Sequence, residues 1–379
     1  MTVPRIAFVT SGLNVGGAEH MLCRVVEAAK ARDWEIMVIS LRDEGGFGER
    51  IESAGVPLLC CNLHRARGAF DLCRALIKLR SFEPALVQGW MYHGSLFASL
   101  FCKALKNRPE VFWSIRQTLL SVSGETFIIA MIIRLLARYS DHVSGVIYNS
   151  GAALKQHAQV GLVSFSDVVI PNGIDIERFR PDLYTRKKTR AALGIGEDEP
   201  VIGIVARFHP MKDHANFFES ARILATSIPS LRVLVVGDGT RAGIVDEAIA
   251  KAGLCGRTVC LGSVKSIEEI YPALDLLVLS SAWGEAWPNV LGEAMACGVT
   301  CVATDVGESR QIVGQTGVIV PVCEPELLAG ACRQMLSLDP AIQRELSRNA
   351  RERIERYFSI EFIFSEYAAR WACIDVRQS

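Results

Sequence analysis

One continuous stretch, residues 276–304, decides the fold; its sequence is LLVLSSAWGEAWPNVLGEAMACGVTCVAT. It opens with an apolar run at residues 276–279 and closes with another at residues 300–304, each of the length and composition of a buried strand. Between them, residues 289–297 have the composition of a helix. A strand, a helix and a strand in this order predict two parallel strands of one sheet.

The same alternation runs along all 379 residues, of which 50% are apolar and 22% charged. It restarts near residue 200, after residues 170–175 and a charged stretch to about Lys188 that we interpret as a linker. Strands are predicted at residues 5–10, 35–40, 85–88, 111–115, 143–148, 201–206, 231–236, 258–261, 276–279 and 300–304. Helices are predicted at residues 18–31, 70–82, 95–106, 127–137, 217–228, 241–252 and 289–297.

These elements predict an α/β protein with two Rossmann-like, doubly wound parallel-sheet domains that face each other across a crevice. The first domain covers residues 1–170 and the second residues 185–357. An amphipathic C-terminal helix at about residues 358–379 is expected to cross back to the first domain. Ligands of such sheets bind at the carboxyl ends of the strands, so the loops that follow strands are the places to look for a site.

Composition narrows the class of partner. The net charge is zero, which gives no support for a nucleic-acid partner. The 12 cysteines form no Cys-x-x-Cys pair or Cys/His cluster at zinc spacing, and no Asp-x-Asp occurs, so no metal site is expected. Unpaired cysteines and the lack of a signal-like segment favour a cytoplasmic location.

One region nevertheless keeps an anionic membrane surface open as a partner. Residues 60–120 carry 9 Lys and Arg against 3 Asp and Glu. The apolar run at residues 127–133 continues into Arg134 and Arg138, one helical turn apart. A core helix and a helix lying on the inner face of the membrane both fit this pattern.

Two loops combine features that suit a phosphate. The first strand is followed by Gly16 and Gly17 just before a helix, so backbone N–H groups can approach an anion, although a tight turn without a ligand fits equally. Arg207 and Lys212 follow the strand at residues 201–206. A planar guanidinium and a point charge suit a diphosphate, and a solvated loop is the alternative.

Two carboxylates flank the start of the helix at residues 289–297. Glu285 lies in the loop before it, and Glu293 lies near its middle among small apolar residues. Pro288 stands where a helix begins, and Gly298 where it ends. A buried carboxylate such as Glu293 needs a polar partner, either a ribose diol or a nearby arginine.

Taken together and in order, these residues resemble glycosyltransferase family 4, a group of retaining enzymes with the GT-B fold. The resemblance extends from residue 5 to about residue 325. The matching segments are Gly16-Gly17-Ala18-Glu19, residues 169–175 (VIPNGID), Ala206-Arg207 with Lys212-Asp213-His214, Gly237-Asp238-Gly239, Glu285 and Glu293 with the following AMACG, residues 304–308 (TDVGE) and residues 317–321 (GVIVP).

The resemblance implies a role for each matched position. Arg207 and Lys212 hold the donor diphosphate, Glu285 contacts the transferred sugar, and His93 faces the sugar and the acceptor. Glu293 holds the ribose hydroxyls. The donor-binding set that the resemblance implies is Gly16, Gly17, Gly237, Asp238, Gly239, Ala286, Trp287, Pro288, Asn289, Val290 and Glu293.

Three positions depart from the family pattern. Ala286 replaces a frequent Gly and Trp287 a frequent Phe or Leu, and both are expected to narrow the sugar pocket. Thr300 replaces the usual Pro.

The function that follows is retaining transfer of a hexose-type sugar from a nucleotide-sugar, with UDP favoured, and without a metal or other cofactor. The expected acceptor is a glycan or a polyprenyl- or other lipid-linked molecule of polysaccharide or lipopolysaccharide biosynthesis, including exopolysaccharide. The alternatives are a sugar-nucleotide epimerase and a non-catalytic partner that binds lipid or sugar nucleotide.

Overall fold

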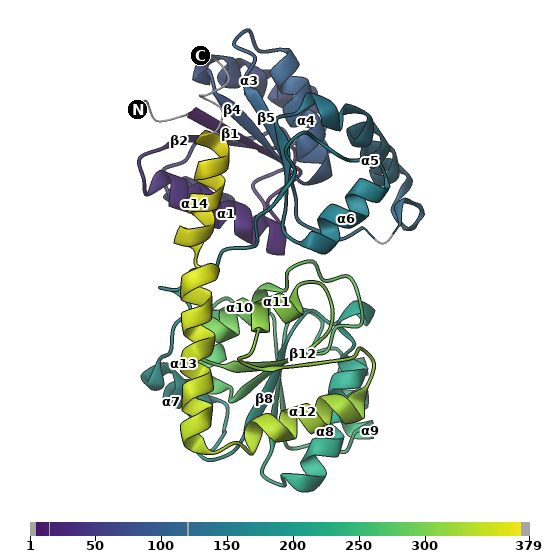
Figure 1. The fold of residues 1–379 in the computed structure, drawn as a ribbon, viewed down its shortest axis with the longest axis vertical. Helices are drawn as coiled ribbons and strands as arrows, with labels where there is room; N and C mark the ends of the chain where they lie inside the picture. The colour runs from purple at the N-terminus through teal and green to yellow at the C-terminus, as the bar shows by residue number, and fades with distance from the viewer. Residues whose placement is uncertain (1–4, 15, 120, 373–379) are drawn as a thin grey trace. The chain divides into compact units, whose positions relative to one another are not determined.

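The chain folds into two compact units, each built on a parallel sheet (Figure 1). A computed structural model describes residues 5–14, 16–119 and 121–372. The first unit comprises Met1–Gly173 with Ile360–Ser379, and the second comprises Ile174–Ser359. The predicted α/β architecture with two doubly wound parallel sheets is therefore confirmed.

In the first unit, seven parallel strands follow the order β3-β2-β1-β4-β5-β6-β7. The strands are β1 (Arg5–Thr10), β2 (Glu35–Ser40), β3 (Leu58–Cys60), β4 (Leu86–Trp90), β5 (Glu110–Ile115), β6 (Gly145–Tyr148) and β7 (Val168–Val169). The α-helices are α1 (Gly17–Lys30), α2 (Gly48–Ser53), α3 (Gly68–Phe82), α4 (Met91–Lys103), α5 (Phe127–Tyr139), α6 (Gly151–Gln159) and α14 (Ile360–Ala372).

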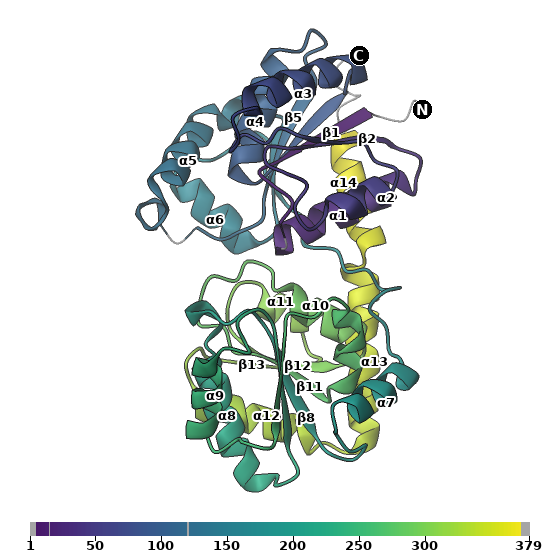
Figure 2. The ribbon, with the colours of Figure 1, turned by 180° about the vertical axis from the view of Figure 1, so that it is seen from behind.

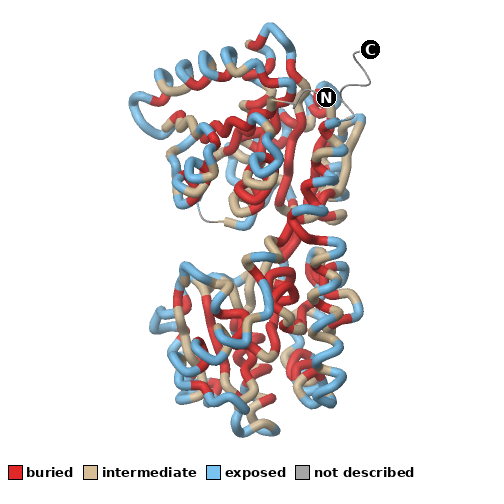
Figure 3. Tube along the Cα trace, turned by 90° about the vertical axis from the view of Figure 1, so that its left-hand side faces the viewer, coloured by how far each residue is buried: buried red, intermediate tan, exposed pale blue. Residues whose placement is uncertain are grey.

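Both faces of this sheet are covered by helices, which explains why its strands are continuously apolar. Along β1, Ile6 and Phe8 pack on the side of α1 and α14, while Ala7 and Val9 pack on the side of α3 and α4. Helix α14 lies beside α1 (Figures 1 and 2). The central strands are buried, and exposed residues concentrate on the outer helices (Figure 3).

A buried arginine fastens α14 to the first unit. Arg116, just after β5, donates to the Tyr367 hydroxyl at 2.7 Å, to the Ile170 carbonyl at 3.3 Å and to Asn172 Oδ1. Its guanidinium lies 5.5 Å from the centre of the Trp90 ring. One cation thus joins the ends of β4, β5 and β7 to the C-terminal helix.

In the second unit, six parallel strands follow the order β10-β9-β8-β11-β12-β13. The strands are β8 (Val201–Val205), β9 (Arg232–Val236), β10 (Thr258–Gly262), β11 (Leu276–Leu279), β12 (Thr300–Thr304) and β13 (Val318–Val320). The α-helices are α7 (Leu183–Ala192), α8 (His214–Ser227), α9 (Gly243–Lys251), α10 (Asn289–Ala296), α11 (Ser309–Val313), α12 (Pro325–Leu336) and α13 (Pro340–Tyr357).

Two sequence predictions about element boundaries were wrong. Helix α7 begins within the stretch interpreted as a linker up to Lys188, where the Asp182 carboxylate accepts from the Thr185 N–H at 2.9 Å and caps the helix. Helix α4 begins at Met91, one turn earlier than predicted. Strands β3, β7 and β13 were not predicted, and residues 373–379 of the predicted C-terminal helix lie outside the described residues.

Helix α5 packs on the core of the first unit with one face only. Ala130, Ile132, Ile133 and Leu136 are buried against the unit, so one face belongs to the core. The opposite face also carries apolar residues, which are exposed. Within the described part of the chain, no helix is both long and apolar enough to span a membrane.

The attachment of α14 can be tested through Tyr367. Replacing Tyr367 with Phe removes the acceptor of the Arg116 guanidinium while keeping the ring. Because a hydrogen bond to a charged group contributes roughly 1.5–3 kcal/mol, we expect the free energy of unfolding to fall by about 2 kcal/mol in urea titrations. The matched Tyr139→Phe variant, whose ring is partly exposed on α5, should change it by less than about 0.5 kcal/mol. Equal effects of the two variants would contradict the conclusion that the Arg116–Tyr367 hydrogen bond fastens α14 to the first unit.

Candidate functional site

The strand order of the second unit reverses between β8 and β11, and the loops that follow these two strands lie side by side. The Ala282 N–H donates to the Met211 carbonyl at 2.9 Å, and the Ser280 hydroxyl donates to the Lys212 carbonyl at 2.8 Å. Ligands of doubly wound sheets bind at such a reversal, outside the carboxyl ends of the strands. The predicted positions after β8 and β11 therefore share one location.

Lys212 and Glu285 form an ion pair at this location. The Lys212 ammonium contacts Glu285 Oε1, and the two side chains are only 17% and 9% exposed. The same carboxylate oxygen accepts from the Ser281 hydroxyl at 2.7 Å, and Thr304 donates to the Ser281 carbonyl at 2.7 Å. A largely buried ion pair is tolerated only when its remaining hydrogen-bonding groups are satisfied, and Ser281 contributes to this.

Sequence reasoning missed Ser281, and it included Thr304 in a matching segment without assigning it a contact in the site. The available signal was their position, since each hydroxyl residue stands at the carboxyl end of a predicted apolar strand, next to a predicted site loop.

The turn after β9 packs closely against the loop that carries Arg207. Phe208 donates its N–H to the Asp238 carbonyl at 2.7 Å. Gly237 has a φ of +142°, and a Cβ there would overlap the Ala206 carbonyl, so a side chain is excluded. Arg207, Asp238 and Gly239 are exposed beside this contact. The structure thus gathers Arg207 and the Gly237–Gly239 turn next to the Lys212 loop.

Helix α10, which follows the loop after β11, carries Glu293. Pro288 occupies its N-cap and Asn289 its first position, followed by Val290, as the sequence indicated. Glu293 is buried, and its Oε2 accepts from the Tyr271 hydroxyl at 3.0 Å. Burial is the main cause that raises the pKa of Tyr271, and the Glu293 carboxylate adds to it. Tyr271 is a partner that the sequence did not reveal.

The expectation that Trp287 narrows a sugar pocket was wrong. Trp287 is buried in the core of the second unit, with its ring 5.6 Å from that of Phe358. Ala286 is also buried, and its carbonyl accepts from the Glu308 N–H at 3.0 Å. The Trp287 side chain therefore packs in the core and supports the loop that precedes α10.

The remaining predicted residues belong to the first unit. Gly16 and Gly17 stand at the start of α1, and His93 stands in the first turn of α4, after β1 and β4 respectively. These strands are neighbours, and the Trp90 indole N–H donates to the Ala18 carbonyl at 2.9 Å. The pKa of His93 is lowered, mainly by burial and also by Arg42. His93 is therefore disposed to stay neutral near pH 7 and to accept or donate a hydrogen bond.

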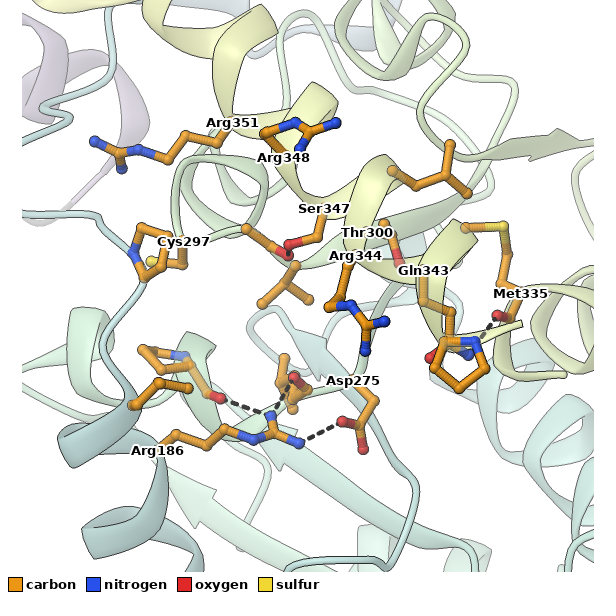
Figure 4. A pocket seen from close by; sticks show the side chains of 18 of the residues that line it. Arg186, Asp275, Cys297, Thr300, Met335, Gln343, Arg344, Ser347, Arg348 and Arg351 are labelled. Carbon is orange, nitrogen blue, oxygen red and sulfur yellow. Dashed lines mark hydrogen bonds and ion pairs between the residues drawn. The ribbon is translucent and has the colours of Figure 1, made fainter. Parts of the chain in front are cut away.

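A pocket of about 850 Å³ lies at the opposite edge of the second sheet, among residues at the amino ends of β8, β11 and β12 (Figure 4). Arg186 in this pocket donates to the Pro272 and Leu274 carbonyls at 2.8 and 2.9 Å and to Asp275 at 2.5 Å. Its cation is already committed to structure, and none of the predicted site residues lines the pocket. We therefore place the functional site at the other edge.

Comparison with known families agrees with this geometry. A family model described as Glycosyltransferase Family 4 matches residues 15–178, and one described as Glycosyl transferases group 1 matches residues 185–353. The crystal structure of Anabaena Alr3699/HepE in complex with UDP superposes with a TM-score of 0.84 at 22% identity, covering 97% of this chain and 100% of that one. The fold is thus that of the GT-B class. The chain belongs to glycosyltransferase family 4.

Two curated relatives match parts of the chain. EpsF of Bacillus subtilis (strain 168) is 35% identical over 137 residues, which are 36% of this chain and 35% of EpsF. The lipopolysaccharide core biosynthesis mannosyltransferase LpsB of Rhizobium meliloti (strain 1021) is 30% identical over 204 residues, which are 52% of this chain and 57% of LpsB. The matched segments thus span about a third to somewhat over half of these relatives.

His214, next to the site, gives a test of the local environment. It begins α8, its ring lies 5.1 Å from Phe208, and burial above all lowers its pKa from 6.5 to about 4. The unfolded chain takes up this proton near pH 6.5 and the folded chain only near pH 4. The corresponding stability is therefore present above pH 6.5 and is lost as the pH falls through 4.

Replacing His214 with Leu should remove this part of the pH dependence. We expect the loss of unfolding free energy between pH 7 and pH 4.5 to be smaller in the variant by about 2 kcal/mol, measured by urea titration at each pH. Carboxylates make the same contribution to the pH dependence of both proteins, so this contribution cancels when the two unfolding free energies are subtracted. Parallel curves for the two proteins would show that His214 is accessible to protons in the folded state.

Proposed function

We propose that the chain transfers a sugar from a nucleotide-sugar to an acceptor and that the second unit holds the donor. The observation that supports this most directly is the Lys212–Glu285 pair at the strand reversal, with Arg207 on the same loop as Lys212. Two cations there would bind the diphosphate of the donor, and Glu285 would bind the hydroxyls of its sugar. Glu293 would hold the ribose.

The chemistry requires charge stabilisation at the departing phosphate. Breaking the anomeric C–O bond leaves negative charge on the nucleotide and positive charge on the sugar. Fixed cations such as Arg207 and Lys212 stabilise the negative charge on the nucleotide without reorganising. Such electrostatic stabilisation is the largest contribution to the rate enhancement of many enzymes. We therefore propose a reaction that needs no metal ion.

The stereochemical course that we propose is retention of the anomeric configuration. Glu285 would serve as a substrate ligand and not as a nucleophile, since its carboxylate is held by Lys212 and Ser281. The acceptor would attack from the face that the phosphate leaves, with the phosphate taking the acceptor proton. Within the first unit, we propose that His93 and the Gly16–Gly17 turn bind substrate.

UDP is the nucleotide that we favour, and the transferred group would be a hexose-type sugar. Related structures of Anabaena HepE contain UDP and UDP-glucose. The acceptor would be a glycan or a lipid-linked molecule of polysaccharide or lipopolysaccharide biosynthesis, in keeping with the name of LpsB.

Nucleotide binding in EDTA tests the donor site. We expect UDP at about 100 times its dissociation constant to stabilise the full chain by about 2.7 kcal/mol in thermal shift and calorimetry, without added metal. Arg207→Met and Lys212→Met should each weaken UDP binding and lower sugar transfer more than tenfold, because each removes a cation from the diphosphate.

Two features make this experiment decisive. Arg207 is exposed, so its replacement leaves folding intact even if Lys212→Met destabilises the buried Glu285. Lys251→Met, at the exposed end of α9, is the matched control and should bind UDP normally. Normal UDP binding and transfer in both site variants would refute the proposed site. Binding with interconversion of the nucleotide-sugar but no transfer would indicate an epimerase.

We also propose that the first unit attaches to the anionic inner face of a membrane. Helix α5 supports this, because Arg134 and Arg138 lie on its exposed face together with exposed apolar residues. Each basic residue near an anionic surface contributes about 1 kcal/mol, and apolar side chains add to this in the interfacial region.

Flotation with vesicles tests the attachment. Binding should require phosphatidylglycerol and weaken as salt is raised from about 0.05 to 0.5 M, because salt screens surface charges. The double variant Arg134→Gln/Arg138→Gln should lose most of this binding. Arg344→Gln/Arg348→Gln, two exposed arginines with the same spacing on α13, is the control. Equal binding to neutral phosphatidylcholine vesicles would contradict the proposal.

A further inference from the structure

Helix α5 presents an apolar stripe to solvent. Phe127, Ile128, Met131 and Leu135 are 79%, 60%, 52% and 37% exposed. Their spacing of one, three and four residues places them on one side of the helix. Four neighbouring apolar side chains on one helix form a contiguous patch, which on a soluble protein marks a surface that contacts something else.

The stripe leads into a groove between α4 and α5. This groove has a volume of about 480 Å³, within the range of roughly 300–1,000 Å³ that ligand pockets occupy. Leu135 and Leu100 belong both to the exposed surface and to the groove wall. The interior of the groove is mainly apolar and is lined by Leu96, Val111, Trp113, Leu136 and Val143.

Two basic side chains line the groove, and the carboxylates nearby already have hydrogen-bond partners. Lys103 and Arg108 both line it, and neither forms an ion pair among the described residues. The Lys103 ammonium lies 4.7 Å from the centre of the Tyr139 ring, which also lines the groove. The carboxylate of Asp141 is held by His142 at 2.6 Å, and that of Glu110 accepts from the Ser144 hydroxyl.

We propose that this groove binds one acyl chain of an anionic membrane phospholipid. The apolar walls would take the chain, and Lys103 and Arg108 would face its phosphate, whose negative charge is not balanced by a choline as it is in a zwitterionic lipid. Continuity between the groove and the α5 stripe lets a lipid enter from the bilayer surface on which the helix lies. The site goes beyond attachment by surface charge, because it takes up part of a lipid molecule.

Trp113 is a built-in reporter of chain entry. It is fully buried at the groove wall, and its indole N–H donates to the Ser99 hydroxyl at 3.0 Å. Bromine on an acyl chain quenches tryptophan fluorescence only at short range. The full chain is mixed with vesicles of phosphatidylglycerol brominated midway along the acyl chain, or with unbrominated vesicles. We expect bromine-dependent quenching, most of which disappears in Trp113→Phe.

A second variant guards against a folding defect in Trp113→Phe. Leu100→Glu places a carboxylate at the groove mouth, on a residue that is 49% exposed. Leu100→Glu should abolish at least two thirds of the quenching, while the protein still floats with the vesicles through α5. The control Leu63→Glu changes an exposed leucine outside the groove and should leave the quenching unchanged.

The possible results separate the proposals. Flotation without Trp113-dependent quenching overturns the lipid groove and leaves the membrane attachment standing. Equal quenching by brominated phosphatidylcholine overturns the role of Lys103 and Arg108. Sugar transfer to a soluble acceptor should be unchanged in Leu100→Glu, so a failure of the groove is distinguishable from a failure of the donor site.

Discussion

The reversal of strand order between β8 and β11 is the constraint on which the candidate site depends. Because both strands are parallel and adjacent, their following loops leave the sheet at one edge and must pack against each other. The backbone bond from Ala282 to Met211 and the Ser280 contact to the Lys212 carbonyl fix that packing. Lys212 and Glu285, 73 residues apart in sequence, are thereby held as a pair.

The pair itself constrains the residues around it. A buried ion pair that loses one partner typically costs roughly 3–5 kcal/mol, a large share of the roughly 5–15 kcal/mol by which an ordinary domain is stable. The neutral Ser281 hydroxyl also donates a hydrogen bond to the carboxylate, so Glu285 keeps an orienting partner when the Lys212 ammonium turns to another anion. In the proposed reaction that anion is the donor diphosphate. Thr304 in turn fixes the backbone of Ser281.

Sequence predicted what depends on periodicity and on the order of motifs, and it missed what depends on contacts. The sequence predicted strands β8, β11 and β12 and helix α10, because each is marked by a continuous apolar run or by Pro and Gly at its ends, which neighbouring residues alone reveal. Strands β3, β7 and β13 have only two or three residues, too few to show a period. Tyr271 and Ser281 were missed because their role exists only through Glu293 and Glu285. Trp287 was misplaced because a motif position does not state which way a side chain points.

Helix α5 shows why some ambiguities in sequence have a physical basis. Its apolar residues surround the helix, so periodicity supports both a core position and a surface position, and the structure gives both at once: Ile133 is buried and Phe127 is exposed. A helix with only a core function would carry polar residues on its outer face, since nothing there offsets exposed apolar area. Arg134 and Arg138 among the exposed apolar residues instead give that face the composition of an interfacial helix, apolar at its centre and cationic beside it. A helix that only faces solvent does not account for this pattern, whereas the proposed contact with an anionic lipid surface would account for it.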